Sequence, residues 1–141
     1  GTKIIFSRRS KVLDNRPFIN LIDIEGERLE MPELVGTDVR FSPDGKKLVF
    51  VSPYYEGKRN KQWEIVLYDL ETKEIQRVTN IPAMKSNLTF SPDGKQIAFV
   101  LWGNGPYKNI GVINIDGTGF RTLLTNPEDV GAYIGSLDWA P

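Results

Sequence analysis

The stretch FSPDGKKLVF, from Phe41 to Phe50, occurs a second time as FSPDGKQIAF, from Phe90 to Phe99. The two copies start 49 residues apart, and a further step of 49 residues reaches Trp139 in LDWAP, where Trp-Ala-Pro corresponds to Phe-Ser-Pro. A second series of related segments, LIDIEGER, LYDLETKE and VINIDGTG, recurs at a similar interval. A period of about 40 to 50 residues is typical of tandem structural repeats. The chain is therefore predicted to consist of similar units in a row.

Each unit is predicted to hold four short antiparallel strands, which we name A to D in chain order. The A strands are expected in DVRF, NLTF and SLDW, and the B, C and D strands of the central unit in KLVFVS, EIVLYDL and EIQRVT. These segments are rich in β-branched, aromatic and aliphatic residues and are bounded by turn-forming residues. The SPDGK segment suits a tight turn between strands A and B, because Pro presets φ, Asp can bond the backbone two residues on and Gly accepts a positive φ.

Four-stranded units that recur in this way are typical of β-propeller blades, because one such sheet cannot bury both faces unless neighbours stack on it. The expected fold is therefore all-β, with blades of four antiparallel strands in a single partial propeller. Blade 1 is expected over about residues 1–36 without its inner A strand, blade 2 over about 37–80 and blade 3 over about 81–126. An inner strand for a further blade is expected over about 135–141.

The repeats resemble a known family. FSPDGKKLVFVS…WEIVLYDLETKEIQRVTN and FSPDGKQIAFV…IGVINIDGTGFRTLLTN are similar to the repeats of TolB-type, WD-repeat-like β-propellers, and the resemblance covers nearly the whole chain. The first blade departs most, since DIEGERLE lacks the Leu-Thr-Asn ending. The resemblance implies half of a six-bladed ring, a periplasmic or cell-envelope setting, and partner proteins bound at one face or at the central channel.

The predicted strand order is incomplete as a ring, because propellers have at least about four blades. The chain runs B-C-D, A-B-C-D, A-B-C-D, A, so the last strand, around Trp139, is the piece that blade 1 lacks. Two alternatives follow. Either two chains close one ring as a homodimer, each donating its terminal strand to the other, or the chain is a segment of a longer propeller. Two half-rings satisfy the closure condition for a head-to-tail assembly.

The composition argues against several classes of function. The 141 residues include no Cys and no His, and 18 basic residues balance 18 acidic ones. Ser-His-Asp and Cys-His arrangements and the usual zinc ligands therefore cannot be assembled within this chain. A neutral chain also makes a nucleic-acid partner less favoured, and no apolar run approaches the roughly 18 residues of a membrane helix. We expect no catalytic residue, no cofactor, no metal and no membrane insertion.

The connections between strands B and C differ most from unit to unit, as SRRSKVLDNRP, SPYYEGKRNKQ and WGNGPYKN. Variable loops on a rigid scaffold are where binding commonly resides, and these are basic and rich in aromatic residues. One interpretation is a face that binds an acidic segment of another protein; the other is a set of solvated loops. The candidate partner-binding residues are Arg8, Arg9, Lys11, Arg16, Tyr54, Tyr55, Lys58, Arg59, Trp102, Tyr107 and Lys108.

The favoured function is a non-catalytic propeller that acts as a protein-interaction scaffold through its B–C and D–A loops. One alternative is an accessory propeller of a larger dipeptidyl-peptidase-like enzyme, and another is a propeller enzyme acting on carbohydrate or lactone substrates. Three tempting motifs are interpreted as turns and loops: NIDGTG as a turn and not a calcium loop, GNGPYK as a hairpin loop, and Asp44 and Asp93 as equivalent turn residues and not a catalytic pair.

Overall fold

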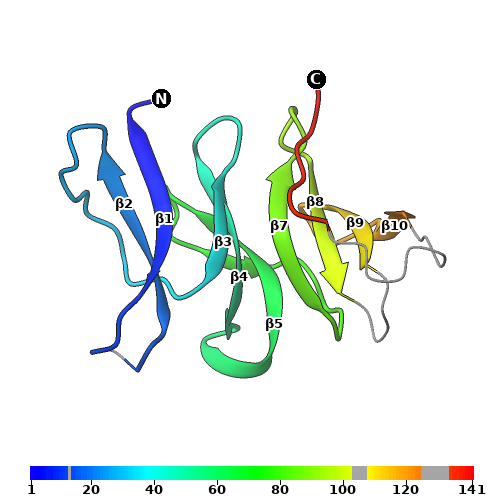
Figure 1. Ribbon diagram of the computed structural model, residues 1–141, viewed down its shortest axis with the longest axis horizontal. Helices are drawn as coiled ribbons and strands as arrows, with labels where there is room; N and C mark the ends of the chain where they lie inside the picture. The colour runs from blue at the N-terminus through cyan, green and yellow to red at the C-terminus, as the bar shows by residue number, and fades with distance from the viewer. Residues whose placement is uncertain (13, 103–107, 125–133) are drawn as a thin grey trace.

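A computed structural model describes residues 1–12, 14–102, 108–124 and 134–141 (Figure 1). The described residues form ten β-strands in antiparallel sheets, and none of them lies in a helix, so none belongs to a helix that could cross a membrane. Two sheets have four strands each and the third has two. The expected all-β architecture of stacked four-stranded blades is confirmed for the two complete sheets.

Blade 2 consists of β3 (Thr37–Phe41), β4 (Lys47–Tyr55), β5 (Lys58–Asp69) and β6 (Ile75–Arg77), paired in chain order. These are the expected strands A to D. Between Thr37 and Arg40 the pairing of β3 with β4 shifts, so that two residues of β3 face one residue of β4. This is a β-bulge, and its first residue, Asp38, has a positive φ of 55°.

Blade 3 repeats the arrangement with β7 (Met84–Phe90), β8 (Gln96–Trp102), β9 (Lys108–Asn114) and β10 (Arg121–Leu124). The bulge recurs between Ser86 and Thr89, where Asn87 has a φ of 54°. Phe90 faces Ile97 as Phe41 faces Leu48 in blade 2. The repeat seen in the sequence is therefore a repeat of strand register as well as of strand order.

Blade 1 contains β1 (Lys3–Arg9) and β2 (Pro17–Asp23), which correspond to strands B and C. In place of a regular D strand, residues 28–35 follow β2 through two isolated bridges, Phe18 to Val35 and Ile22 to Arg28. β1 is the edge of this sheet and pairs with β2 alone. In the described part of the chain, no A strand pairs with β1.

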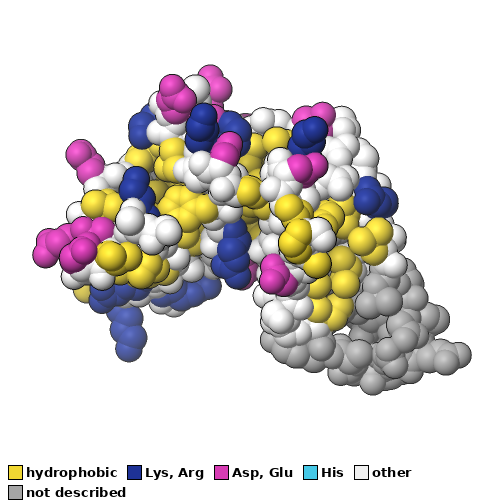
Figure 2. Space-filling model, turned by 90° about the horizontal axis from the view of Figure 1, so that it is seen from above, with side chains coloured by type: hydrophobic (Ala, Val, Ile, Leu, Met, Phe, Trp, Pro, Cys, Tyr) yellow, Lys and Arg dark blue, Asp and Glu magenta, His cyan; other side chains and the backbone are white. Residues whose placement is uncertain are grey.

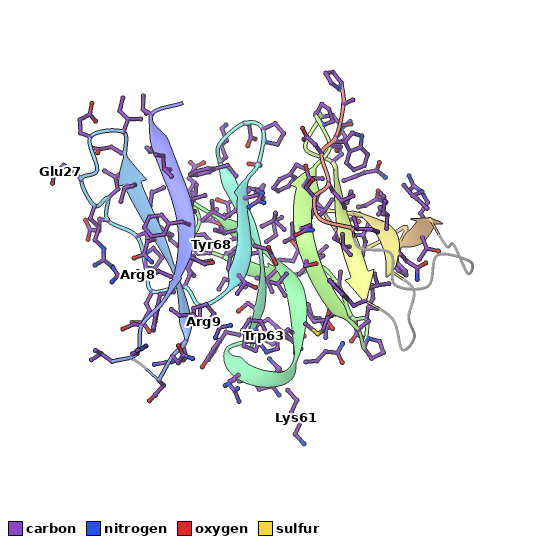
Figure 3. The ribbon with its side chains drawn as sticks, in the orientation of Figure 1. Arg8, Arg9, Glu27, Lys61, Trp63 and Tyr68 are labelled. Carbon is purple, nitrogen blue, oxygen red and sulfur yellow. The ribbon has the colours of Figure 1, made fainter. Side chains whose placement is uncertain are left out.

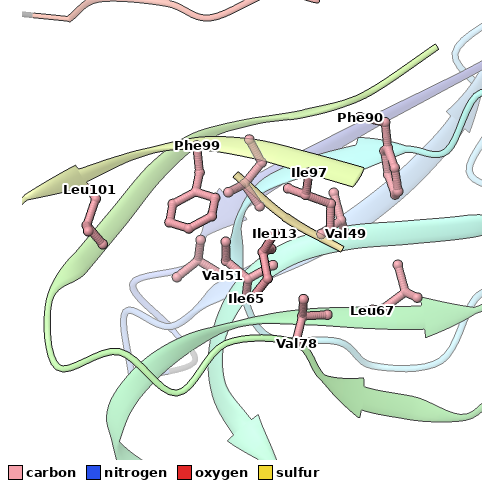
Figure 4. Packing of buried hydrophobic residues seen from close by; sticks show 11 residues of the cluster. Val49, Val51, Ile65, Leu67, Val78, Phe90, Ile97, Phe99, Leu101 and Ile113 are labelled. Carbon is pink, nitrogen blue, oxygen red and sulfur yellow. The ribbon is translucent and has the colours of Figure 1, made fainter. Parts of the chain in front are cut away.

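Two apolar clusters hold the blades together. One lies between blades 2 and 3 and contains Val49 and Ile65 from one side and Ile97 and Phe99 from the other (Figure 4). The second lies between blades 1 and 2 and contains Ile19 with the equivalent aromatic and aliphatic residues of β3, β4 and β5. Because alternate residues of β4 enter different clusters, both faces of blade 2 are buried. The strands of a central blade therefore have continuous apolar runs in their sequences, and polar and apolar residues do not alternate along them.

The SPDGK turns have the same hydrogen bonds in both copies. In the first copy the Ser42 hydroxyl donates to Asp44 Oδ1 at 2.6 Å, and the same carboxylate accepts from the Lys46 amide at 3.0 Å. In the second copy Asp93 accepts from the Ser91 hydroxyl at 2.6 Å and from the Lys95 amide at 3.0 Å. These bonds lower the pKa of both carboxyl groups. The turn interpretation of Asp44 and Asp93 is confirmed.

Residues 134–141 run beside β7 at the open side of blade 3 and are not paired as a strand (Figure 1). The Asn87 side-chain amide donates to the carbonyl oxygen of Gly135 at 3.0 Å. Trp139 is half-buried in this position. That this segment serves as the inner strand of a neighbouring blade stays a prediction.

Candidate partner-binding groove

The B–C connections of blades 1 and 2 lie at one end of the molecule, the lower end in Figure 1. The opposite end, seen from above in Figure 2, carries acidic and basic side chains intermixed around apolar ones. In blade 2 most of the variable connection SPYYEGKRNKQ lies within strands. There, β4 and β5 continue as a hairpin closed by Glu56 and Gly57, whose φ values of 56° and 72° are those of a tight type I′ turn.

A groove with a volume of about 880 Å³ lies at this end. It is bounded by the end of β1, the starts of β3, β5 and β7, and the end of β8, so all three blades contribute to it. Its lining residues are Arg9, Thr37, Val51, Lys61, Gln62, Trp63, Pro82, Ala83, Met84, Lys85 and Trp102. Figure 3 shows Arg9, Trp63 and Lys61 near this end of the sheets.

The lining of the groove is cationic and apolar. Three of its residues carry positive charge and none is Asp or Glu. Arg9 donates one hydrogen bond to the carbonyl oxygen of Asn15 at 3.1 Å, and Lys61 is exposed and forms no ion pair with any described residue. The Trp102 indole donates to the Ser86 hydroxyl at 2.9 Å, which fixes the plane of its ring. The groove therefore offers two available cations beside fixed aromatic surface.

A buried ion pair lies beneath the groove. Lys85 Nζ is 2.8 Å from Glu64 Oε2, and both side chains are fully buried. Lys85 also donates to the carbonyl oxygens of Trp63, at 2.9 Å, and Ile81. The Glu64 carboxylate accepts further hydrogen bonds from the side chains of Gln62 and Thr79 and from the Ile81 amide, at 3.1 Å. Burial lowers the pKa of Lys85, and the bond to Glu64 opposes that shift in part.

This pair joins blade 2 to blade 3, and the equivalent positions in the other repeats hold different residues. By strand register, Glu64 corresponds to Phe18 in β2 and to Asn109 in β9. Gly36 lies 49 residues before Lys85. Asn109 Oδ1 is buried and has no hydrogen-bond partner in the part of the chain that the structure describes. The boundary between blades 1 and 2 thus differs in chemistry from the boundary between blades 2 and 3, and blade 3 carries Asn109 at the position of Glu64.

The structure brings only some of the predicted partner-binding residues together. Arg9 and Trp102 line the groove. Arg8 is the neighbour of Arg9 in β1, so the two side chains point to opposite faces of the strand and cannot both enter it. Lys11 is exposed in the connection to β2. Tyr107 and the Lys108 side chain lie outside the described part of the chain.

Other predicted residues have structural roles. Tyr55 is only 6% exposed and belongs to the cluster between blades 1 and 2, so its ring is not on the binding face. Its hydroxyl donates to the Gln62 carbonyl oxygen at 3.1 Å. Arg16 lies over the Phe18 ring at 5.4 Å, and a hydrogen bond to half-buried Tyr54 raises the pKa of its guanidinium.

The remaining two candidates, Lys58 and Arg59, are exposed at the tip of the β4–β5 hairpin and outside the groove.

Sequence reasoning did not single out the buried Glu64–Lys85 pair or the groove residue Met84. Both charged residues lie within strands, and a strand buried on both faces has no alternation that would mark an inward charge. The sequence position of each residue could have indicated a buried charge. Glu64 begins the apolar run EIVLYDL, and Lys85 begins the predicted strand segment KSNLTF. Among the described residues there is no group of three or more Asp or Glu side chains that could hold a metal ion.

The turn interpretation of NIDGTG is confirmed, because Asp116 accepts hydrogen bonds from both the amide, at 3.0 Å, and the hydroxyl of Thr118, at 2.6 Å. The carboxylate is therefore engaged within its own turn. GNGPYK lies almost entirely outside the described residues, so its interpretation stays a prediction.

Comparison with solved structures supports the fold. TolB from Acinetobacter baumannii superposes with a TM-score of 0.69 at 25% identity, over 87% of this chain and 30% of that one. A protein of Agrobacterium tumefaciens assigned as TolB gives a TM-score of 0.70 at 21% identity, over 88% of this chain and 46% of that one. The β-propeller domain of the Trilobed protease from Pyrococcus furiosus gives 0.67 at 18% identity, over 91% and 41%.

The chain spans less than half of the length of each of these proteins. No protein-family model matches the sequence, and no curated protein sequence matches it either. The expected resemblance to TolB-type propeller repeats is confirmed by the superpositions, which show the same arrangement of β-strands.

Proposed function

Since the chain has the fold of part of a TolB-type propeller, we propose that it is a non-catalytic interaction scaffold whose groove binds an acidic segment of another protein. The observation that carries this proposal is the composition of the groove. Its lining contains the cations Arg9 and Lys61 and the side chains of Trp63, Met84 and Trp102, and it contains no acidic residue. Complementary charge favours encounter and orientation, and aromatic side chains supply contact area. The resemblance to TolB further favours a periplasmic or envelope setting.

A peptide of matching chemistry would place its carboxylates near the two available cations and an apolar side chain against Trp63 or Trp102. Lys85 contributes no free charge, because its ammonium group is already neutralised by Glu64. Its role is to hold the groove floor, where it joins the backbone of Trp63 to the start of β7. The recognition is therefore assigned to Arg9 and Lys61 and to the aromatic surface between them.

The test uses a short fluorescein-labelled peptide in which Glu alternates with Phe, with binding followed by fluorescence anisotropy. A peptide with Lys in place of Glu is the probe control. Lys61→Glu and Arg9→Glu should each weaken binding by about 2- to 10-fold, since an exposed ion pair contributes at most about 1 kcal/mol and reversal adds repulsion. Lys58→Glu makes the same charge change on the same hairpin but outside the groove, and should change affinity less than about twofold.

Binding should also weaken with added salt, because the two cations are solvent-accessible. Equal affinity for the Glu and Lys peptides would overturn the proposal. A loss in Lys58→Glu that matches the loss in Lys61→Glu would move the site from the groove to the hairpin tip.

A second candidate, an accessory propeller of a larger peptidase, is supported by similarity to peptidase structures. Besides the Trilobed protease domain, an acylaminoacyl peptidase of Pyrococcus horikoshii superposes with a TM-score of 0.58 at 16% identity. At this identity the likeness concerns the fold alone. This candidate requires a catalytic domain in the parent protein, which the sequence of the complete reading frame would reveal. The third expectation, a carbohydrate- or lactone-acting enzyme, finds no comparable support.

A further inference from the structure

The pairing of β4 with β5 is interrupted beside the groove. Ser52 faces Glu64 and Tyr54 faces Arg59, so one residue of β4 lies opposite four residues of β5. We call these four residues, 60–63, the β5 bulge. A bulge changes the direction in which side chains leave a strand, and bulges are often found beside active sites.

The β5 bulge departs from the repeat. The residue opposite it, Pro53, takes the position of Arg9 and Trp102 in the other two B strands, each three residues after an equivalent Phe. Those two strands pair with their C strands without interruption, as far as Arg9 with Pro17 and Trp102 with Lys108. Proline has no backbone amide to donate to a neighbouring strand, so within sheets it occurs mainly at edges and bulges. A single difference between the repeats therefore favours the bulge in blade 2.

The β5 bulge forms one wall of the groove. Lys61, Gln62 and Trp63 are consecutive in the chain, and all three line the groove. In a regular strand successive side chains point to opposite faces, so three consecutive residues could not all face one groove. The bulge therefore allows a cation and an indole to lie on the same wall. The residues that the proposed function needs thus depend on the conformation of this short segment.

Side-chain hydrogen bonds hold the β5 bulge. The Asn60 amide group donates to the carbonyl oxygens of Pro53 at 3.3 Å and Tyr55 at 3.0 Å. It also lies 3.1 Å from the carbonyl oxygen of Lys58. The Tyr55 hydroxyl donates to the Gln62 carbonyl oxygen at 3.1 Å, and its ring is anchored in the apolar cluster between blades 1 and 2. Two points of the bulge are therefore tied to the rest of blade 2.

We propose that Asn60 and Tyr55 are positioning residues of the groove, which hold the β5 bulge in the conformation that presents Lys61 and Trp63 to an acidic segment. This inference rests on the proposed function, because it concerns the same groove. Neither Asn60 nor Tyr55 lines the groove, so both act through the residues of the bulge. A bulge without these bonds would have to be ordered when the peptide binds, and that ordering lowers affinity.

The first test removes one hydrogen bond at a time. Tyr55→Phe deletes the hydroxyl and leaves the ring in its apolar cluster. It should weaken binding of the labelled peptide of alternating Glu and Phe by about 2- to 10-fold, the range for one lost hydrogen bond. Asn60→Ala should weaken binding by at least about as much, because its amide group has several acceptors.

Tyr68→Phe is the matched control. It makes the same chemical change in the same apolar cluster, and the buried Tyr68 hydroxyl has no hydrogen-bond partner among the described residues. Its removal should change peptide affinity by less than about twofold. Urea unfolding of each variant would establish that the protein is folded under the conditions of the binding assay.

A double-mutant cycle separates positioning from a general weakening of the fold. If Tyr55 acts through the β5 bulge, Tyr55→Phe should weaken binding by a smaller factor when Lys61 is already replaced by Ala. Arg9 lies on β1 and outside the bulge, so the effects of Tyr55→Phe and Arg9→Ala should multiply within about twofold. Effects that multiply fully with both Lys61→Ala and Arg9→Ala would overturn the positioning role.

The outcomes distinguish this inference from the proposed function. If the unmodified chain prefers the Glu peptide to the Lys peptide, unchanged affinity in Tyr55→Phe or Asn60→Ala would overturn the role of that residue and leave the proposed function intact. A loss in Tyr68→Phe as large as in Tyr55→Phe would do the same. An unmodified chain that binds neither peptide, or both equally, would overturn the proposed function and the positioning role together.

Discussion

Replacing Lys85 by Met tests how far blades 2 and 3 depend on one buried ion pair. Met keeps the length of the side chain but removes its charge and its three hydrogen bonds, to Glu64, Trp63 and Ile81. The Glu64 carboxylate would stay fully buried with three neutral donors and no cation. Removing one member of a buried ion pair costs about 3 to 5 kcal/mol, because the remaining charge is uncompensated.

The change in stability can be measured by urea unfolding at pH 7. We expect Lys85→Met to lower the free energy of unfolding by about 3 to 5 kcal/mol, which for a chain of this size corresponds to a fall in Tm of roughly 9 to 20 °C. Lys95→Met is the matched control. Lys95 is exposed in a turn and forms no ion pair with any described residue, so its loss should change stability by less than about 0.5 kcal/mol.

The double variant Glu64→Gln with Lys85→Met separates the charge from the packing. Removing both charges relieves the uncompensated carboxylate, so the double variant should recover at least about 2 kcal/mol relative to Lys85→Met alone. The reasoning is refuted if Lys85→Met costs less than about 1 kcal/mol, or if the double variant is no more stable than the single one.

Two further predictions concern packing and acid stability. A Cβ atom on Gly111 would lie 2.7 Å from the Phe99 ring, so Gly111→Ala should lower the free energy of unfolding by about 1 to 3 kcal/mol in urea titrations. Asp69 accepts hydrogen bonds from Lys47 and two backbone amides, which depress the pKa of its carboxyl group. Because the unfolded state then binds the proton more tightly, this stability is present above about pH 4 and is lost as pH falls below it. Asp69→Asn should therefore lower Tm at pH 7 and flatten the fall in Tm towards pH 2, and an unchanged pH profile would contradict this.

The parts of the fold that depend on local chemistry could be predicted from the sequence. The SPDGK segments specify their turns through residues that bond within the turn itself, as Ser42 with Asp44 shows. The A strands of blades 2 and 3 were located because they directly precede these turns at a fixed interval. The β4–β5 hairpin of blade 2 was not predicted. Its turn has a positive φ at both Glu56 and Gly57, and a Glu in the sequence does not indicate that conformation, whereas a Gly permits it.

The candidate site could be predicted only in part, because it depends on how three blades come together. Arg9 and Trp102 were found since they lie beside variable connections, but nothing local distinguishes Arg9 from Arg8 before the direction of β1 is known. The same holds for Tyr55, whose burial results from a neighbouring blade. Lys85 and Glu64 are 21 residues apart in the chain and meet across a blade boundary.

The different residues at the blade boundaries determine which blade can stack on which neighbour. If the blades were identical, any blade could stack on any other, and a chain of repeats would be open to misassembly during folding. Here a blade carrying Glu64 matches a neighbour that offers Lys85, and the boundary with Phe18 offers no such cation. A wrongly placed blade would leave a buried charge without its partner. The ion pair thus favours the stacking of blade 3 on blade 2, so that similar repeats still assemble in one spatial order.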